Sequence, residues 1–158
     1  MRGRWMILIA ALLAGLTAIS TAQAEEKEKK IKREALPAAV EKTVAAESQG
    51  ATIKGFSREI EDGKTYYEMA LTVNDHSRDV LMDEQGAIVE VEEEVALDSL
   101  PAAVKESLTK GAGSGKIKKV ESLTKHGKLV AYEAAVMKGT KRSEVQVGPD
   151  GKKLAHPE

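Results

Sequence analysis

The segment Leu36-Pro37-Ala38-Ala39-Val40 occurs a second time, unchanged, as Leu100-Pro101-Ala102-Ala103-Val104, displaced by 64 residues. Further residues match at the same displacement and, after one inserted residue, at a displacement of 65. These matches pair Ile53 with Ile117, Gly63 with Gly127, Tyr67-Glu68 with Tyr132-Glu133, and Gly86 with Gly151. Because self-similarity at a fixed period is typical of a repeated structural unit, the sequence predicts two tandem repeats, at 34–94 and 95–158.

Each repeat is expected to begin with one helix. A proline suits the first helical turn and keeps the residue before it out of the helical region, so Leu36 and Leu100 are predicted to precede the two helices. Gly50 and Gly111 stand where each apolar helical stripe ends, and glycine readily takes the left-handed conformation of a helix cap. The glycine-rich segment 111–115 is predicted to be a flexible connector.

Strands are expected after each helix, because the sequence alternates apolar and polar residues between turn signals such as Asp62-Gly63 and Gln85-Gly86. This spacing predicts a three- to four-stranded antiparallel meander in each repeat. The first strand of both repeats breaks the alternation, at Ile53–Phe56 and at Ile117–Val120. Either a β-bulge or a loop residue beneath the helix explains that break.

The predicted fold class is therefore α+β, with the helices of both repeats on one face of the sheet and the other face open to solvent. Alternation assigns a mixed, acidic set of side chains to this open face. They are Tyr66, Glu68, Thr72, Asp79, Leu81, Ile88, Glu90, Glu92, Glu133, Met137, Glu144 and Gln146. Tyr66, Leu81 and Met137 are the candidate contacts with a partner.

Residues 1–24 have the order of a secretory signal peptide. Arg2 and Arg4 precede a 15-residue apolar run that is short for a membrane span, and Ala22-Gln23-Ala24 ends the segment. Cleavage after Ala24 is favoured over an uncleaved anchor. We therefore expect a periplasmic or extracellular product without stable membrane insertion, beginning with a charged flexible segment at 25–33.

Composition excludes several classes of function. The chain has no cysteine, which rules out disulfide scaffolds, zinc ribbons, iron–sulfur proteins and cysteine nucleophiles. Its formal charge of -1 gives no electrostatic reason to expect nucleic acid. The basic stretch formed by Lys116, Lys118, Lys119, Lys125 and Lys128 lacks interleaved aromatic residues, so nucleic-acid binding is disfavoured there as well.

No catalytic, cofactor-binding or metal-binding motif is found. His76, His126 and His156 lie in predicted turns or at the tail, and none has the spacing of a helical metal ligand. No serine lies in a Gly-x-Ser-x-Gly elbow, and the glycine-rich segment lacks a Walker ending. We expect no enzyme and no cofactor. The acidic run at 90–94 lacks the pattern of an EF-hand, which favours a solvated sheet edge over a calcium loop.

The Leu-Pro-x-Ala-Val helix start, the hairpin leading to Tyr67-Glu68, and the closing strands around Gly86 together resemble a PepSY-type domain in tandem. More closely, the chain resembles the PepSY-like group related in fold to beta-lactamase-inhibitor proteins. The resemblance covers nearly the whole mature chain and implies binding rather than turnover, with an inhibitory or regulatory contact to a protease as the usual proposal. The missing cysteines argue against carrying over beta-lactamase inhibition itself.

The leading functional hypothesis is a secreted, non-enzymatic binding protein that contacts a protein or peptide, a protease among the candidates. Contact is expected across the open sheet face or along an exposed edge strand. The alternative is a sensor of a small ligand or divalent cation that uses the acidic surface. An enzyme comes third, and requires a deep pocket that gathers His76 or His126 with carboxylates.

Overall fold

The computed structural model describes residues 28–158, so the predicted signal peptide and its cleavage site lie outside the described residues. Residues 28–158 form eight strands and two α-helices, each preceded by a short 3-10 helix. In order they are β1 (Lys29–Ile31), η1 (Arg33–Ala35), α1 (Ala38–Glu47), β2 (Thr52–Glu61), β3 (Lys64–Val73), β4 (His76–Asp83), β5 (Ile88–Glu94), η2 (Leu97–Ser99), α2 (Ala102–Ala112), β6 (Lys116–Lys125), β7 (Lys128–Lys138) and β8 (Lys141–Val147).

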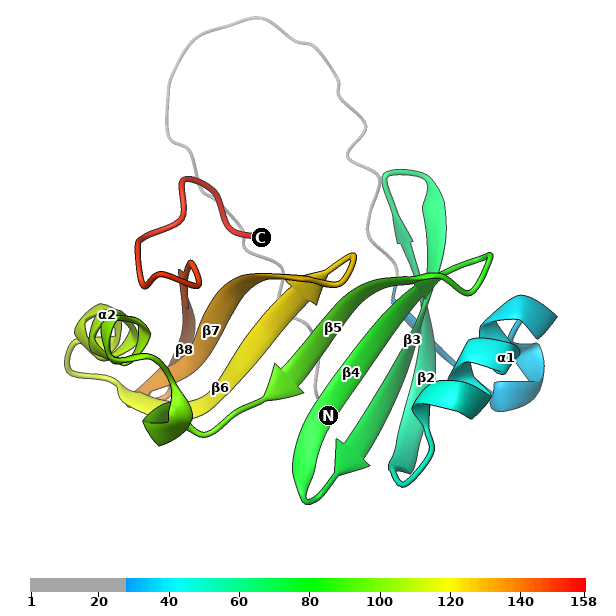
Figure 1. Cartoon of the computed structure of the whole chain (residues 1–158), viewed down its shortest axis with the longest axis horizontal. Helices are drawn as coiled ribbons and strands as arrows, with labels where there is room; N and C mark the ends of the chain where they lie inside the picture. The colour runs from blue at the N-terminus through cyan, green and yellow to red at the C-terminus, as the bar shows by residue number, and fades with distance from the viewer. Residues whose placement is uncertain (1–27) are drawn as a thin grey trace, which may run out of the picture.

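All eight strands form one antiparallel sheet in sequence order (Figure 1). The α+β class is thus confirmed, and the three- to four-stranded meanders expected in the two halves are parts of one eight-stranded meander. β5 pairs with β6 over five residues, from Glu90 opposite Lys125 to Glu94 opposite Glu121. The acidic run at 90–94 is therefore in the middle of the sheet, and its interpretation as a sheet edge was wrong.

Each helix closes a separate apolar core over one half of the sheet. α1 begins directly after Pro37 and α2 directly after Pro101, as the sequence predicts. The buried residues of the first core are Val40, Val44, Tyr67, Met69, Leu71, Val80 and Met82. Those of the second are Leu100, Val104, Leu108, Val120, Ala134, Val136 and Val147. Each core is small, and the shared sheet connects them.

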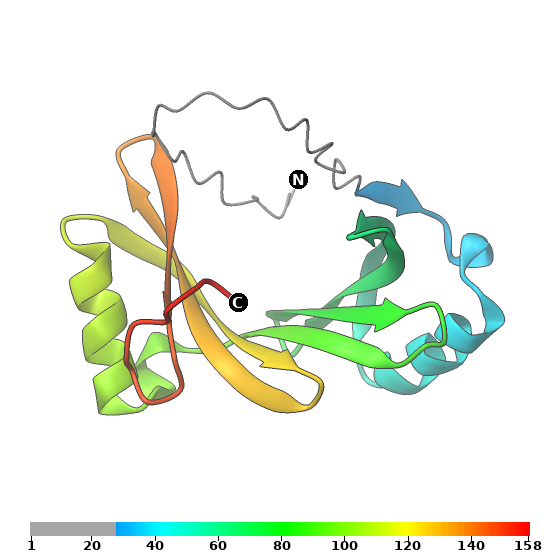
Figure 2. The same ribbon diagram turned by 90° about the horizontal axis from the view of Figure 1, so that it is seen from above.

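Both helices lie on the same side of the sheet. The pairing of β5 with β6 shows that the helix side is the same in both halves. Val91 packs into the first core and lies opposite Thr124. Thr124 in turn faces the same side as Val120 of the second core. Figure 2 shows α1 and α2 on the outer side of the curved sheet. The opposite side forms the open face that the alternation predicts.

The break in alternation at the start of β2 and β6 is a β-bulge. The register shifts between Ile53 and Gly55 in β2, and between Ile117 and Lys119 in β6. Of the two explanations, the bulge is confirmed at both positions. A further shift between Leu81 and Met82 corrects another assignment: Ile88 lies opposite Met82 and packs into the first core, so it does not belong to the open face.

Two segments expected to be flexible contain regular structure in their described residues. Gly111 and Ala112 form the last turn of α2, and a Cβ at Gly111 would lie 2.4 Å from Val145 Cγ1, so this glycine permits close packing of helix on β8. Within the charged segment 25–33, Lys29–Ile31 pairs with β2 as strand β1. Ile31 packs into the first core, which anchors that strand.

A glycine turn touches the first turn of the helix in each half. An ideal Cβ on Gly86 would lie 2.5 Å from the carbonyl oxygen of Ala39, and one on Gly151 would lie 2.6 Å from that of Ala103. Both glycines have a positive φ, of 76° and 78°. The two halves thus use the same contact to place a turn under a helix, whereas the duplication itself stays a prediction.

Replacing Gly86 with alanine tests this contact. We expect Gly86→Ala to lower the free energy of unfolding by about 2–4 kcal/mol, from the left-handed backbone together with overpacking against Ala39. Gly63 is the matched control, because its φ is 75° and no atom lies within 4 Å of the place that a Cβ would occupy, so Gly63→Ala is expected to lose only about 1 kcal/mol. Urea denaturation measures both, and equal losses would contradict the role of the contact.

Candidate functional site

The open face is dominated by carboxylates. Its acidic side chains come from seven neighbouring strands, β2 to β8, and Lys119, Lys125 and Arg142 lie among them. The acids in the body of the sheet are Glu59, Glu68, Asp79, Glu90, Glu92, Glu94, Glu121, Glu133 and Glu144, and Glu61 and Asp83 lie at the strand ends. Because no helix among residues 28–158 covers this side, the acids dominate the chemistry of the exposed surface.

One line of side chains crosses the open face from β4 to β8, and we call it the glutamate row. It consists of Ser77, Glu94, Glu121, Glu133 and Gln146. Glu94 lies opposite Glu121, and Glu121 lies opposite Glu133. Like charges in directly opposite positions destabilise a sheet. Folding therefore places these carboxylates side by side against their mutual repulsion.

Polar neighbours offset part of this repulsion. The backbone N–H and the hydroxyl of Ser77 donate to Glu94 Oε2 at 3.1 and 2.9 Å. These bonds, chiefly the backbone one, hold the pKa of Glu94 below its ordinary range, and the nearby charge of Lys119 adds to the effect. Lys119 also forms an ion pair with Glu121 and donates to Ser77 Oγ at 3.1 Å.

Glu133 is in the opposite situation. Burial raises the pKa of its carboxyl group, and the charges of Glu144 and Glu121 raise it further, against the lowering effect of a hydrogen bond from Gln146. That bond joins Gln146 Nε2 to Glu133 Oε2 at 2.6 Å. Ionisation of Glu133 therefore destabilises the folded state, and we call this penalty the strain in the glutamate row.

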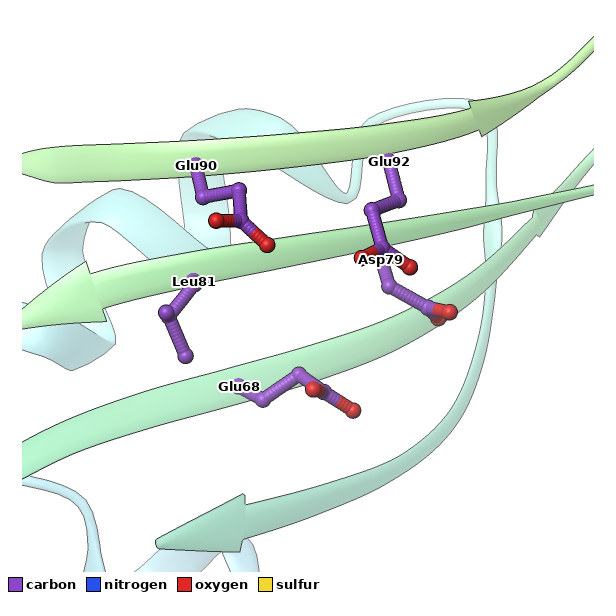
Figure 3. A pocket seen from close by; sticks show the side chains of 5 residues that line it. All are labelled: Glu68, Asp79, Leu81, Glu90 and Glu92. Atoms are coloured by element: carbon purple, nitrogen blue, oxygen red, sulfur yellow. The ribbon is translucent and has the colours of Figure 1, made fainter. Parts of the chain in front are cut away.

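A small pocket lies beside the row. Its lining side chains come from β3, β4 and β5 and are Glu68, Asp79, Leu81, Glu90 and Glu92 (Figure 3). Leu81 is only 5% exposed, although it lies on the open face. Two more apolar residues of this face, Leu123 and Ala131, are also buried. The acids thus surround three buried apolar residues, Leu81, Leu123 and Ala131, which we call the apolar floor.

Three of the carboxylates come close enough to share a cation. One oxygen each from Asp79, Glu92 and Glu121, on strands β4, β5 and β6, lies within 4.8 Å of the other two. Oxygen ligands of this kind suit calcium, which takes six to eight of them and completes its shell with water. The trio is the group of side chains most suited to hold a metal in the described part of the chain.

The predicted contact residues are only partly brought together. Tyr66 and Leu81 lie on adjacent strands of the first half, whereas Met137 lies opposite Arg142 near the far edge of the sheet. Leu81 is a buried floor residue, and Tyr66 and Met137 are half-buried. Whether a partner touches any of the three stays a prediction. His76 and His126 are exposed and do not line the pocket.

The C-terminal residue reaches the open face. The backbone N–H of Glu158 donates to Gln146 Oε1 at 3.0 Å, and its carboxylate lies 3.7 Å from Lys125 Nζ. Lys125 is also 3.9 Å from Glu90. The backbone of Glu158 therefore makes a hydrogen bond to this face, and its carboxylate lies beside Lys125, one of the few cations there.

Sequence reasoning missed three acids of the open face, Glu59, Glu94 and Glu121, and the continuity of the face. Alternation counted from Ile117 puts Glu121 on the helix side, and only alternation counted from Val120, after the bulge, puts it on the open face. The spacing of Glu90, Glu92 and Glu94 did carry a signal: these acids alternate with Val89, Val91 and Glu93, as in a strand with one polar face. Such a pattern indicates a strand with one face toward a core, and it does not reveal that the strand is paired on both sides.

Comparisons with known proteins support the fold. No protein-family model and no curated protein matches the chain. Among solved structures, it is similar to a DUF2874 family protein from Bacteroides ovatus, with 20% identity, coverage of 75% of this chain and 84% of that chain, and a TM-score of 0.59. A BLIP-like protein from Bacteroides fragilis has 19% identity, coverage of 75% and 83%, and a TM-score of 0.57.

A third similar structure is a protein of inferred periplasmic location from Bacteroides eggerthii. It has 19% identity, coverage of 75% of this chain and 86% of that chain, and a TM-score of 0.61. At these identities the likeness establishes the fold alone, and the chain has a BLIP-like fold. Within residues 28–158, no helix combines the length and apolar character needed to cross a membrane.

Replacing Glu133 with glutamine tests the strain in the glutamate row. Because the folded-state pKa of Glu133 is raised, its ionisation penalises the folded state fully above that pKa, and the penalty disappears as the pH falls below the unfolded value of about 4.3. We expect Glu133→Gln, which keeps an acceptor for Gln146, to raise the free energy of unfolding by about 0.5–1 kcal/mol at neutral pH and to change it little at acidic pH.

Urea denaturation at several pH values measures this difference. Glu106→Gln, on the exposed side of α2, removes the same charge away from the open face and is the control. A loss of stability in Glu133→Gln at neutral pH would contradict the strain, because it would mean that the carboxylate stabilises the fold.

Proposed function

We propose that the chain is a non-enzymatic binding protein that contacts a protein or peptide through its open face. The observation that carries the proposal is an eight-stranded sheet with both helices on one side and a continuous acidic surface on the other. A sheet face of this size without a covering element is a typical place for a partner to bind. The BLIP-like name of one structural neighbour is consistent with an inhibitor-like role, with a protease among the candidate partners.

A periplasmic location belongs to the same proposal. The order of residues in 1–24 favours export and cleavage after Ala24, and one structural neighbour is described by a periplasmic location. We also propose that the two halves are tandem PepSY-like units. The equivalent contacts of Gly86 with Ala39 and of Gly151 with Ala103 support such a repeat.

Site-specific photocrosslinking in the native compartment tests the binding proposal. We expect p-benzoylphenylalanine at Tyr66 and at Met137, on the open face, to give the same protein adduct by mass spectrometry. The same group at Lys42 and at Glu106, exposed on α1 and α2, is the control and is expected to give none. Adducts from the helix positions alone, or from no position, would refute binding through the open face.

A second candidate function is binding of a divalent cation, and the trio of Asp79, Glu92 and Glu121 favours it. Their oxygens come from three adjacent strands, so the sheet itself would set the spacing of the ligands. A weak site is expected, since calcium sites with few charged ligands and bound water in extracellular modules have dissociation constants of about 0.1–1 mM.

Isothermal titration calorimetry with calcium tests this candidate. Binding by the unaltered chain is expected to weaken about tenfold or more in Asp79→Asn/Glu92→Gln, because two of the three ligands lose their charge. Glu68→Gln/Glu144→Gln removes the same charge from the same face outside the trio and is the control. Equal weakening in both variants would mean that calcium is attracted by the whole acidic face and not by a defined site. Absence of heat at millimolar calcium would refute this candidate function.

A further inference from the structure

We propose that the partner presents an extended, cationic segment with lysine or arginine at every second position, and that this segment lies along β5. The inference rests on the proposed binding function and specifies the chemistry of the partner. Three features of the open face carry it: repeated opposition of like charges, the spacing of the acids along β5, and a buried apolar floor between the acids.

The first feature is a set of carboxylates that repel one another across strands. Asp79 lies opposite Glu92, and the glutamate row places Glu121 between Glu94 and Glu133. Each such pair is unfavourable by up to about 1 kcal/mol. A cation bound between two such carboxylates attracts both of them. Several adjacent carboxylates are therefore expected to bind a positive partner more tightly than isolated acids would. Anionic partners such as nucleic acid or a lipid surface are repelled for the same reason.

The second feature is spacing. Glu90, Glu92 and Glu94 occupy alternate positions of β5 and point to the open face. Alternate residues of a strand are about 6.8 Å apart, and alternate side chains of an extended peptide have the same repeat. A segment that lies along β5 therefore meets one carboxylate of this strand with each alternate side chain. Asp79 on one flank and Glu121 on the other supply a second carboxylate near the middle position.

The third feature is the floor. Leu81, Leu123 and Ala131 are buried on this face, between the acidic side chains. Lysine and arginine have long apolar stems that pack on such residues while the charged end reaches a carboxylate. A metal ion has no such stem. The combination of apolar floor and flanking acids therefore fits a basic side chain better than a bare cation.

The chain itself provides an example of a polypeptide on this face. The backbone N–H of Glu158 donates to Gln146 at the end of the glutamate row, and its carboxylate lies near Lys125.

Two synthetic peptides of the same length, composition and charge test the inference by fluorescence anisotropy with the purified chain. In one peptide lysine alternates with threonine, and in the other the lysines are paired in doublets. We expect the alternating peptide to bind about tenfold more tightly, and its affinity to fall as salt is added. Equal affinities would overturn the spacing, and absence of binding by both peptides would overturn the cationic segment.

Variants locate the binding. Glu92→Gln/Glu121→Gln removes two acids beside the expected path and is expected to weaken the alternating peptide about tenfold. Glu84→Gln/Glu106→Gln removes the same charge from an exposed turn and from α2, and is expected to change affinity less than about twofold. Equal weakening in the two variants would overturn the path along β5.

The result separates this inference from the function on which it rests. A partner that crosslinks through Tyr66 and Met137, with no binding of either lysine peptide, would refute the cationic segment and leave the open-face function standing. Absence of both would refute both. Binding of calcium alone, with neither peptide bound nor partner crosslinked, would also refute the inference and leave the divalent-cation candidate.

Discussion

The pairing of β5 with β6 determines the architecture of this protein. Val91 lies opposite Thr124 on the helix side, and Glu92 lies opposite Leu123 on the open side. A shift of one residue would turn Val91 away from the first core, so apolar packing under α1 fixes the register. The same register brings Glu94 opposite Glu121. A core that forms on one side of the sheet thus forces carboxylates together on the other.

The two cores explain how the sheet tolerates this repulsion. Each helix buries only two residues, Val40 with Val44 or Val104 with Leu108, but the strands beneath them contribute most of each core. Burial of a single large aliphatic side chain contributes about 1.5–3 kcal/mol, more than one opposed pair of acids removes. Ser77, Lys119 and Gln146 then relieve the glutamate row at particular positions.

Features set by local chemistry were predictable from the sequence. Pro37 and Pro101 define the helix starts, and the broken alternation at Ile53 and Ile117 indicates the two bulges. Long-range contacts were not predictable in this way. The bulge at Val89, opposite the step from Leu81 to Met82, turns Ile88 inward, Val145 packs closely on Gly111, and the β5–β6 pairing joins the halves. Each of these features depends on a residue that is distant in sequence, so the alternation of nearby residues does not predict it.

The acids of the open face are not required by the fold. Threonine or valine at Glu92 or Glu121 would suit a central strand better, because β-branched residues favour strands and would remove the opposition of like charges. The helix-side residues, by contrast, are dictated by packing. A function is therefore expected in the charges at the centre of the sheet, because some of them, such as ionised Glu133, oppose its stability.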